Sequence, residues 1–171
     1  DRGVPLLALE PYTVVFDREV AAALLAAMVQ ALSADAVQKG RSVFASRLGE
    51  TLASPLVTIF DDGLAPAGMA TNPFDAEGVP RQTTPLFEAG VLRSYLHSSY
   101  TARKEGPDVR STGNAGRGSY RSAPGVSATN LVMKAGEGGL PELFARVGEG
   151  LYVDSVAGLH SGVNPVTGEI S

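Results

Sequence analysis

The distribution of chain-breaking residues is the feature that most constrains what this sequence can fold into. The chain of 171 residues contains 20 glycines and 11 prolines, and most of them lie after Gly63. Residues 17–50 are instead rich in alanine and leucine. Because glycine and proline interrupt helices and mark turns, this distribution predicts a helical first third followed by short strands joined by turns.

The helical third has clear local signals. Asp17 is a good N-cap residue, and Glu19 follows in the first turn. Apolar residues from Val20 to Leu32 recur at helical spacing, and most of the rest are alanine, which predicts a buried helix. A second short helix is expected over residues 34–39, and another turn or two of helix over residues 42–48.

Short apolar and β-branched runs predict extended segments along the rest of the chain. Two of these runs flank Ala89-Gly90, which predicts a β-hairpin. A helical turn over residues 100–105 and a helix that begins at Pro141 are also expected. The expected extended segments are 4–9, 12–16, 56–60, 81–88, 91–97, 129–134 and 151–156. This order of elements predicts a single α+β domain with a mostly antiparallel sheet.

Composition excludes several classes of protein. The net charge is −4 and there is no dense basic run, which argues against a dedicated nucleic-acid binder. The absence of cysteine excludes disulfides and thiolate metal sites in this chain and suits a reducing cytoplasm. The longest apolar run, 20–29, is too short to span a bilayer. Because the chain begins at Asp1 and stops at Ser171 where a strand is starting, we expect a piece of a longer protein.

The two histidines are not spaced as a local zinc site. His97 lies in an expected strand, and a half-exposed structural role is favoured for it over a catalytic one. His160 lies in a glycine-rich loop that can approach a ligand closely, although a structural role is favoured there too.

Two carboxylate pairs, Asp61-Asp62 and Asp75 with Glu77, could hold a cation or divide acid and base roles if they converged. Both lie next to glycine, so a turn-stabilising role is favoured. The glycine-rich segment 112–118 lacks a Walker pattern and is a weak phosphate-site candidate. The serines at 119, 122 and 161 have no neighbouring base, so the sequence does not support a serine hydrolase.

From about Ala45 to Ser171 the chain resembles the TldD/PmbA family through a series of motifs in family order and spacing. Each motif alone is weak, and the series together is specific. The motifs are Pro73 to Pro80, Glu88 to Leu92, Tyr100 to Lys104, Ser111 to Asn114, Thr129 to Leu131, Gly150 to Val153 and Gly162 to Gly168.

This resemblance implies a β-rich, barrel-like C-terminal domain of the TldD/PmbA type, with residues 1–171 as one fragment of it. A family N-terminal α/β domain and the C-terminal end of the β domain would then be absent. Family members are described as modulators of DNA gyrase and as components of a cytoplasmic metallopeptidase. In that heterodimer, which degrades or matures unfolded peptides, the TldD-type subunit carries zinc on an H-E-x-x-x-H helix.

The expected helix 34–39 and its flanks contain no histidine, which resembles the PmbA (TldE) type of subunit that lacks the zinc motif. The resemblance therefore assigns no catalytic residue, metal ligand or cofactor to this chain. Zinc is expected on a TldD-type partner subunit, and the chain is expected to be inactive alone.

Two functions from different classes remain open. The first is a non-zinc subunit of a metallopeptidase complex, in which this chain forms a wall of the substrate chamber and a dimer surface. The complex would be a heterodimer or a homodimer, and no membrane contact is expected. The second is a non-catalytic binding or adaptor module that contacts gyrase or DNA through a basic segment. For that segment, a solvated loop is the favoured interpretation. The basic residues concerned are Arg103, Lys104, Arg110, Arg117 and Arg121. A stand-alone enzyme with an unfamiliar site is a minor third alternative.

If the chain handles peptides, an extended substrate would pair with a strand edge beside small, polar residues. The segments 111–114 and 158–164 have this composition. We therefore expect Asn114, His160 and Asn164 to line one face of a common cleft. Substitution of Asn114 or His160 is then expected to lower peptide turnover with little loss of folding stability.

Overall fold

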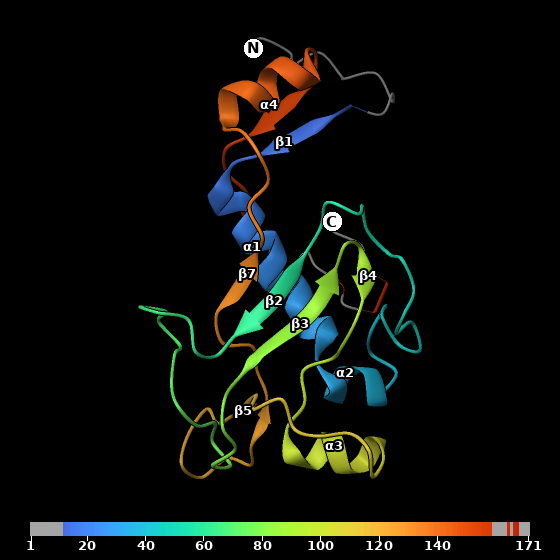
Figure 1. Ribbon diagram of the computed structural model, residues 1–171, viewed down its shortest axis with the longest axis vertical. Coiled ribbons are helices and arrows are strands. Elements are labelled where there is room, and N and C mark those ends of the chain that lie inside the picture. Colours follow the sequence, from blue (N-terminus) through green and yellow to red (C-terminus); the bar gives the residue numbers. More distant parts are fainter. Residues whose placement is uncertain (1–11, 159–163, 165, 168–171) are drawn as a thin grey trace.

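A four-stranded antiparallel sheet forms the centre of the computed structural model, which describes residues 12–158, 164, 166 and 167 (Figure 1). Its strands lie in the order β4-β3-β2-β7. They are β2 (Ile59–Asp62), β3 (Thr83–Glu88), β4 (Val91–Leu92) and β7 (Leu131–Met133). The expected α+β fold with a mostly antiparallel sheet is confirmed. The barrel-like closure is not: within the described residues the sheet is open, because β4 is only two residues long and β7 pairs on one side only.

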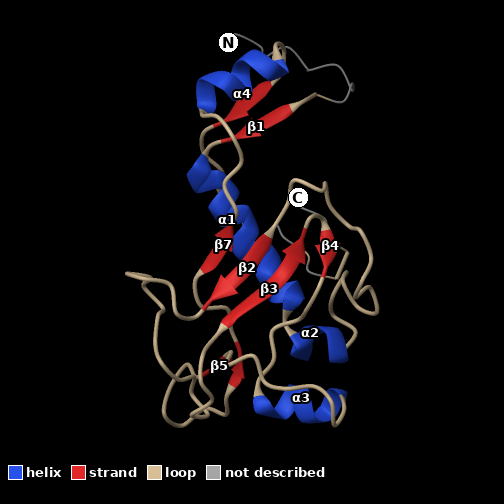
Figure 2. Cartoon of the chain, viewed as in Figure 1, coloured by secondary structure: helices blue, strands red, loops and turns tan. Residues whose placement is uncertain are grey.

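The first third of the chain is helical, as expected (Figure 2). Helix α1 (Arg18–Met28) begins where the Asp17 carboxylate accepts a hydrogen bond from the Glu19 amide at 2.9 Å. A 3-10 turn, Val29–Leu32, leads into α2 (Ala34–Gln38). The buried core joins this helical region to the sheet. Its members are Val29, Ala31, Leu32, Ala34, Phe44, Ile59, Leu86, Phe87, Leu92, Tyr95 and Leu96.

The expected hairpin is present as β3 and β4. Its turn residues, Ala89 and Gly90, have φ values of 48° and 81°, as a two-residue type I′ turn requires. A Cβ atom at Gly90 would lie 2.2 Å from the Ala53 carbonyl oxygen, so glycine is required there. The second strand ends at Leu92 and not at residue 97, because the chain leaves the sheet and buries Tyr95 in the core.

Two local expectations are wrong. Residues 42–48 form turns and no helix: the Ser42 hydroxyl accepts from the Phe44 amide, and Ser46 has a φ of 62°, which a helix does not allow. The strand expected over 56–60 begins only at Ile59 and continues to Asp62, so the turn expected at Asp61-Asp62-Gly63 begins only after Asp62.

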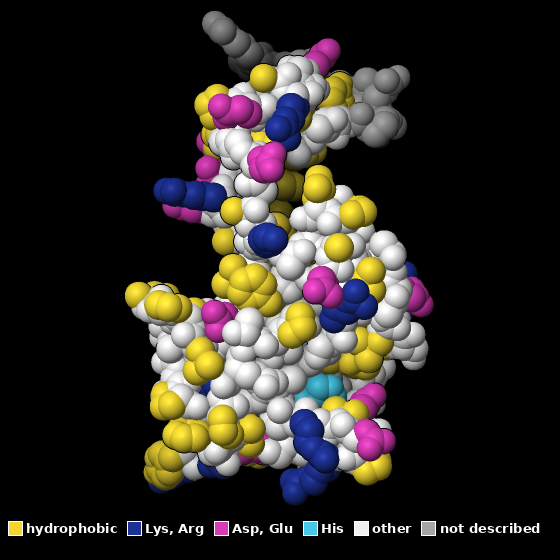
Figure 3. Space-filling view, viewed as in Figure 1, with side chains coloured by type: hydrophobic (Ala, Val, Ile, Leu, Met, Phe, Trp, Pro, Cys, Tyr) yellow, Lys and Arg dark blue, Asp and Glu magenta, His cyan; other side chains and the backbone are white. Residues whose placement is uncertain are grey.

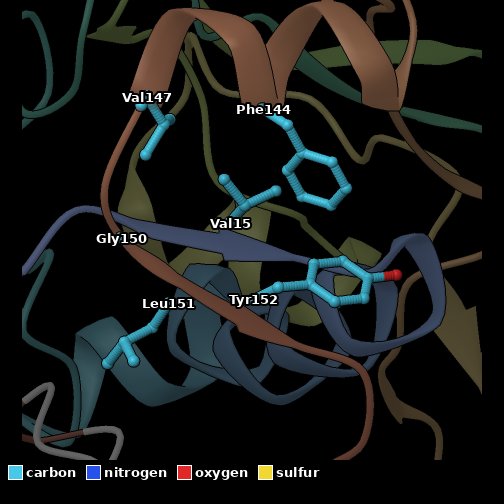
Figure 4. Close-up of a pocket in the computed structure, with 7 residues that line it drawn as sticks. Val15, Phe144, Val147, Gly150, Leu151 and Tyr152 are labelled. Carbon is cyan, nitrogen blue, oxygen red and sulfur yellow. The ribbon is translucent and has the colours of Figure 1, made fainter.

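A small unit lies at one end of the molecule (Figure 1). Strand β1 (Val14–Phe16) pairs in parallel with β8 (Leu151–Val153), and α4 (Leu140–Val147) packs on this pair. The rings of Phe144 and Tyr152 meet edge to face at 5.3 Å beside a cavity of about 120 Å³ (Figure 4). We call this the β1–α4–β8 unit.

The opposite end carries α3 (Ser99–Glu105) and a short antiparallel pair, β5 (Ala115–Gly116) with β6 (Gly125–Val126). Ser98 caps α3: its hydroxyl accepts from the Thr101 amide, and the Thr101 side chain accepts from the Ser98 amide. This end brings the polar residues around Asn114 next to β2. The expected segment 4–9 lies outside the described residues.

Candidate functional site

The turn that precedes β5 is fixed to the backbone of His97. The His97 amide donates to the Thr112 hydroxyl at 2.8 Å, and the His97 carbonyl oxygen accepts from the Ser111 hydroxyl and the Thr112 amide, both at 3.2 Å. Gly113 has a φ of 73°, and a Cβ atom there would lie 2.6 Å from the Pro80 carbonyl oxygen. The segment 111–114 is therefore a well-defined turn inside the domain.

Asn114 lies at the end of this turn and is buried, with 1% of its surface exposed. Its Nδ2 donates to Asp61 Oδ2 at 2.7 Å and to the Ser127 carbonyl oxygen at 3.1 Å. Its Oδ1 accepts from the Thr112 hydroxyl at 2.6 Å. The side chain thus joins β2, the turn and the chain before β7, and in this chain it does not face solvent.

Asp61 is the centre of this polar network. It is 1% exposed and also accepts from the Thr129 amide at 2.6 Å and from the Thr129 hydroxyl at 2.9 Å. The expected turn role holds for Asp62, whose Oδ1 accepts from the Leu64 amide at 3.0 Å. For Asp61 it is wrong, because donors from two distant segments hold its carboxylate inside the fold.

The second carboxylate pair stabilises turns, as expected. Asp75 Oδ1 accepts from the amides of Glu77 and Val79, and Asp75 Oδ2 accepts from the Ala115 amide at 3.0 Å. Glu77 Oε2 accepts from the Ser99 amide at the start of α3, at 2.8 Å. These carboxylates are occupied by backbone donors. Across the part of the chain that the structure describes, no group of three or more His, Cys, Asp or Glu residues could hold a metal ion.

His97 is not the half-exposed strand residue that was expected. It lies between β4 and α3 and is 6% exposed. Burial lowers the pKa of its imidazole below the ordinary value, while the Glu105 carboxylate acts in the opposite direction. Its Nδ1 has no hydrogen-bond partner among the described residues. Among the described residues, no hydrogen bond pairs this imidazole with a nucleophile.

The other two candidate substrate residues lie near the end of the chain. His160 lies outside the described residues. Asn164 is exposed, and its Oδ1 accepts from the amides of Val166 and Thr167 at 2.9 and 3.4 Å, as in an Asn-initiated turn. The cleft shared by Asn114, His160 and Asn164 therefore stays a prediction.

The basic side chains of the segment 103–121 are all exposed. They gather at the end of the molecule that carries α3 (Figure 3). Arg110 donates to the Pro107 carbonyl oxygen at 2.7 Å, and the Arg121 guanidinium lies 5.1 Å from the centre of the Tyr120 ring. These contacts leave the charges open to solvent.

Sequence reasoning missed the partners that complete the network, Thr112, Ser127 and Thr129. Thr112 and Thr129 lie in motifs that were singled out, Ser111 to Asn114 and Thr129 to Leu131. No local pattern shows that these segments meet at Asp61.

Among the described residues, no helix has the length and apolar character needed to cross a membrane.

Comparison with known proteins identifies related sequences. Residues 10–171 match the model of the PmbA/TldA metallopeptidase C-terminal domain. An uncharacterised protein of Methanocaldococcus jannaschii is 39% identical over 84% of this chain and 33% of its own length. A metalloprotease TldD homolog of Haemophilus influenzae is 37% identical over 74% of this chain and 26% of its own length. A metalloprotease PmbA homolog of the same organism is 33% identical over 92% of this chain and 32% of its own length.

Solved structures share the fold. A candidate modulator of a DNA gyrase from Thermotoga maritima matches with a TM-score of 0.84 at 34% identity, over 94% of this chain and 36% of that chain. TldE from Thermococcus kodakarensis matches with a TM-score of 0.72 at 24% identity, over 85% of this chain and 35% of that chain, which is a likeness of fold alone. The chain therefore spans about a quarter to a third of the length of these relatives.

Proposed function

Because the chain belongs to the PmbA/TldD metallopeptidase family, whose C-terminal domain model it matches over residues 10–171, we propose that it is a non-zinc subunit of a TldD/PmbA-type peptidase complex. In this role it forms a wall of the chamber in which peptides are processed, and it contributes a surface for subunit contact. The complex acts in the cytoplasm. The zinc ion belongs to a TldD-type partner subunit, with which the chain forms a heterodimer.

The hydrogen bonds that the carboxylates already accept are the observation that supports the non-zinc assignment. The oxygens of Asp61 and Asp75 accept from buried amides and hydroxyls, and Glu77 accepts from a helix amide. Among the described residues, His97 Nδ1 makes no hydrogen bond to these carboxylates. These residues do not fit a zinc site, which requires three or four convergent nitrogen, sulfur or oxygen ligands. Relatives named TldD and relatives named PmbA both match the chain, so these similarities do not distinguish the two subunit types. The proposal of the PmbA type is therefore based on the poor fit of these residues to a zinc site.

The substrate side of the proposal involves the segments 111–114 and 158–164. We propose that His160 and Asn164 contact an extended peptide. Asn114 would contribute indirectly, because its buried side chain holds the turn 111–114 in place through a hydrogen bond of 2.7 Å to Asp61. The exposed Asn164 has its carbonyl oxygen occupied by backbone amides and keeps its NH₂ group for a peptide carbonyl.

Metal analysis and reconstitution test this function. The full-length protein that contains this chain is purified alone and together with a TldD-type subunit. We expect zinc in the partner alone and cleavage of an unfolded peptide only in the mixture. One tightly bound zinc per molecule of the isolated protein, or peptide cleavage without the partner, would contradict the proposal.

The adaptor alternative is favoured by one observation, the exposed basic segment around α3. DNA binding through such side chains weakens steeply with salt, because each phosphate contact releases condensed counterions. Binding of a DNA duplex that is salt-dependent and is lost when Arg103, Lys104, Arg117 and Arg121 are replaced by alanine would support the adaptor. Absent or salt-insensitive binding would leave the peptidase subunit as the better account.

A further inference from the structure

The end of the molecule that carries α3 differs in charge from the rest of the chain. Residues 100–121 contain five basic and two acidic side chains, a net charge of +3, whereas the whole chain has a net charge of −4. The five basic side chains are all exposed. We call them the basic cluster: Arg103, Lys104, Arg110, Arg117 and Arg121. A positive region on a negative chain attracts anionic groups to that region alone.

Carboxylates of the chain do not neutralise the basic cluster. Among the described residues, the ion pairs lie elsewhere and join Lys39 to Asp35, Arg47 to Glu50 and Arg93 to Glu88. The carboxylates of Asp75 and Glu77 accept from backbone amides, as described above. Glu105 Oε2 accepts from Gln38 Nε2 at 2.7 Å. The five positive charges are therefore available to a ligand.

Neighbouring structure holds the cluster in place. Gln38 of α2 donates to the Thr101 carbonyl oxygen at 2.8 Å and to the Glu105 carboxylate at 2.7 Å, which fixes α3 against α2. Arg110 is tied to its own loop by the hydrogen bond from its Nη1 to the Pro107 carbonyl oxygen. A surface that is already ordered loses less conformational entropy when a ligand binds to it.

An exposed aromatic ring lies within the cluster, in a defined turn. The Ser122 hydroxyl donates to the Ser119 carbonyl oxygen at 2.9 Å and accepts from the Ser119 amide at 3.1 Å, which closes the turn 119–122. Tyr120 in this turn is 80% exposed, and the Arg121 guanidinium lies over its ring, 5.1 Å from the centre. Tyrosine and arginine are enriched among the residues that contribute most to binding at protein interfaces. The turn thus presents an apolar surface beside a cation.

We infer that the basic cluster binds the carboxylates of acidic segments in unfolded peptides. This inference rests on the proposed function, which makes such peptides substrates, and it names their chemical class. The cluster flanks the turn 111–114, since Arg110 precedes it directly and Arg117 follows it by three residues. The Cα atoms of both arginines therefore lie within about 11 Å of the turn, and an extended decapeptide spans about 33 Å.

An acidic peptide fits the cluster better than a nucleic acid does. Four of the five members are arginine, whose planar guanidinium donates two parallel hydrogen bonds to one carboxylate. Because the whole chain has a net charge of −4 and residues 100–121 have +3, the remainder has −7. A long duplex that extends beyond the cluster would be repelled by that remainder, whereas a short acidic segment contacts the cluster alone.

Peptide binding to the full-length protein, without a partner subunit, tests this inference separately from cleavage. The probe is a fluorescent decapeptide with four Glu residues, and the matched peptide has Gln at the same positions. In about 50 mM salt we expect the Glu peptide to bind at least about fivefold more tightly. This preference should shrink in about 300 mM salt, because salt screens exposed charges. Equal affinity for the two peptides in low salt would overturn the inference.

Neutral substitutions in the cluster give a second readout. Arg117→Gln and Arg121→Gln should each weaken binding of the Glu peptide about two- to fivefold, as is typical of exposed ion pairs, and leave the Gln peptide unaffected. Arg146→Gln is the matched control, since Arg146 is an exposed arginine of α4, at the opposite end of the molecule (Figure 1). An equal loss in Arg146→Gln, or no loss when both cluster arginines are replaced, would overturn the inference.

Two further measurements separate this inference from its neighbours. With a TldD-type subunit added, cleavage of the Glu and Gln peptides with equal kcat/KM would overturn the inference and leave the proposed function intact. Selective binding of the Glu peptide without cleavage in that mixture would support the inference and contradict the proposed function. A DNA duplex of about twelve base pairs that binds more tightly than the Glu peptide, and is lost in the same variants, would overturn the inference in favour of a nucleic-acid site.

Discussion

Replacement of Asn114 by aspartate tests the buried network most directly. In Asn114→Asp the Nδ2 atom, which donates to Asp61 Oδ2 at 2.7 Å, becomes a carboxylate oxygen with no change of shape. Two ionised carboxylates at this distance repel by about 6 kcal/mol at an effective dielectric constant of about 20. Keeping one carboxyl protonated at pH 7 costs about 4 kcal/mol, since its reference pKa is about 3.9 and each unit costs about 1.4 kcal/mol.

Protonation is the less costly alternative, so the variant should fold with one proton shared by the pair. The free energy of unfolding at pH 7 should fall by about 4 kcal/mol. The sign of the pH dependence follows from proton binding. The folded variant holds a proton that the unfolded chain releases above pH 4, so the loss of stability should shrink by about 1.4 kcal/mol per unit as the pH falls from 7 towards 4.

Urea unfolding followed by circular dichroism at pH 7, 6 and 5 measures this effect, as the difference between variant and parent at each pH. Asn72→Asp is the matched control, because Asn72 is exposed and the same change there should alter stability little at any pH. A variant as stable as the parent at pH 7, or with an unchanged difference at pH 5, would refute the assignment of Asn114 to a buried network.

Three further predictions concern single positions. Gly90→Ala should cost about 2–4 kcal/mol of unfolding free energy, measured by urea unfolding, because the new Cβ would lie 2.2 Å from the Ala53 carbonyl oxygen at a φ of +81°; no loss would contradict the turn geometry. Ser98→Ala should cost about 1 kcal/mol and speed exchange of the Thr101 amide, since it removes the cap of α3. Burial lowers the pKa of His97, so the folded protein binds fewer protons than the unfolded chain as the pH falls below about 6.5. Unfolding free energy should therefore decline between pH 7.5 and 5.5, and His97→Gln should flatten that decline; an equal decline in the variant would contradict it.

The Asn114 prediction also changes what activity data at this position mean. The sequence suggested that its substitution would lower peptide turnover with little loss of stability. Since Asn114 is 1% exposed and its side chain makes hydrogen bonds to three other residues, we now expect a large loss of stability. A loss of turnover in an Asn114 variant therefore identifies a substrate contact only if the folded fraction is measured at the same time.

Local signals in the sequence placed most elements correctly. The start of α1 at Asp17 and the hairpin turn at Ala89-Gly90 each depend on residues within a few positions, so they are readable without the fold. Asp61 was assigned wrongly because its donors lie far away, 53 residues on at Asn114 and 68 residues on at Thr129. A carboxylate beside glycine looks like a turn residue until such distant donors are known.

The site was predictable to a smaller extent than the fold. The family motifs marked Ser111 to Asn114 and Thr129 to Leu131 as special, and the structure brings both to Asp61. Whether a residue in such a motif faces inward or outward depends on packing between segments, which no spacing rule reports. The sequence also predicted a buried α1, whereas the structure leaves most of this helix exposed beside the open edge of β7.

The parallel pairing of β1 with β8 has a consequence for the order in which the protein folds. Tyr152 and Asp17, which meet at 2.9 Å in this unit, are separated by 135 residues. Closing a flexible loop of that length costs about 4 kcal/mol in chain entropy, more than three-residue strands and one aromatic pair can offset from an unfolded chain. Once the central sheet has formed, both ends already lie close together and most of that cost has been met. We expect the β1–α4–β8 unit to assemble last and to open first. Pairing of β1 with β8 therefore indicates that the part of the chain between these two strands has already folded.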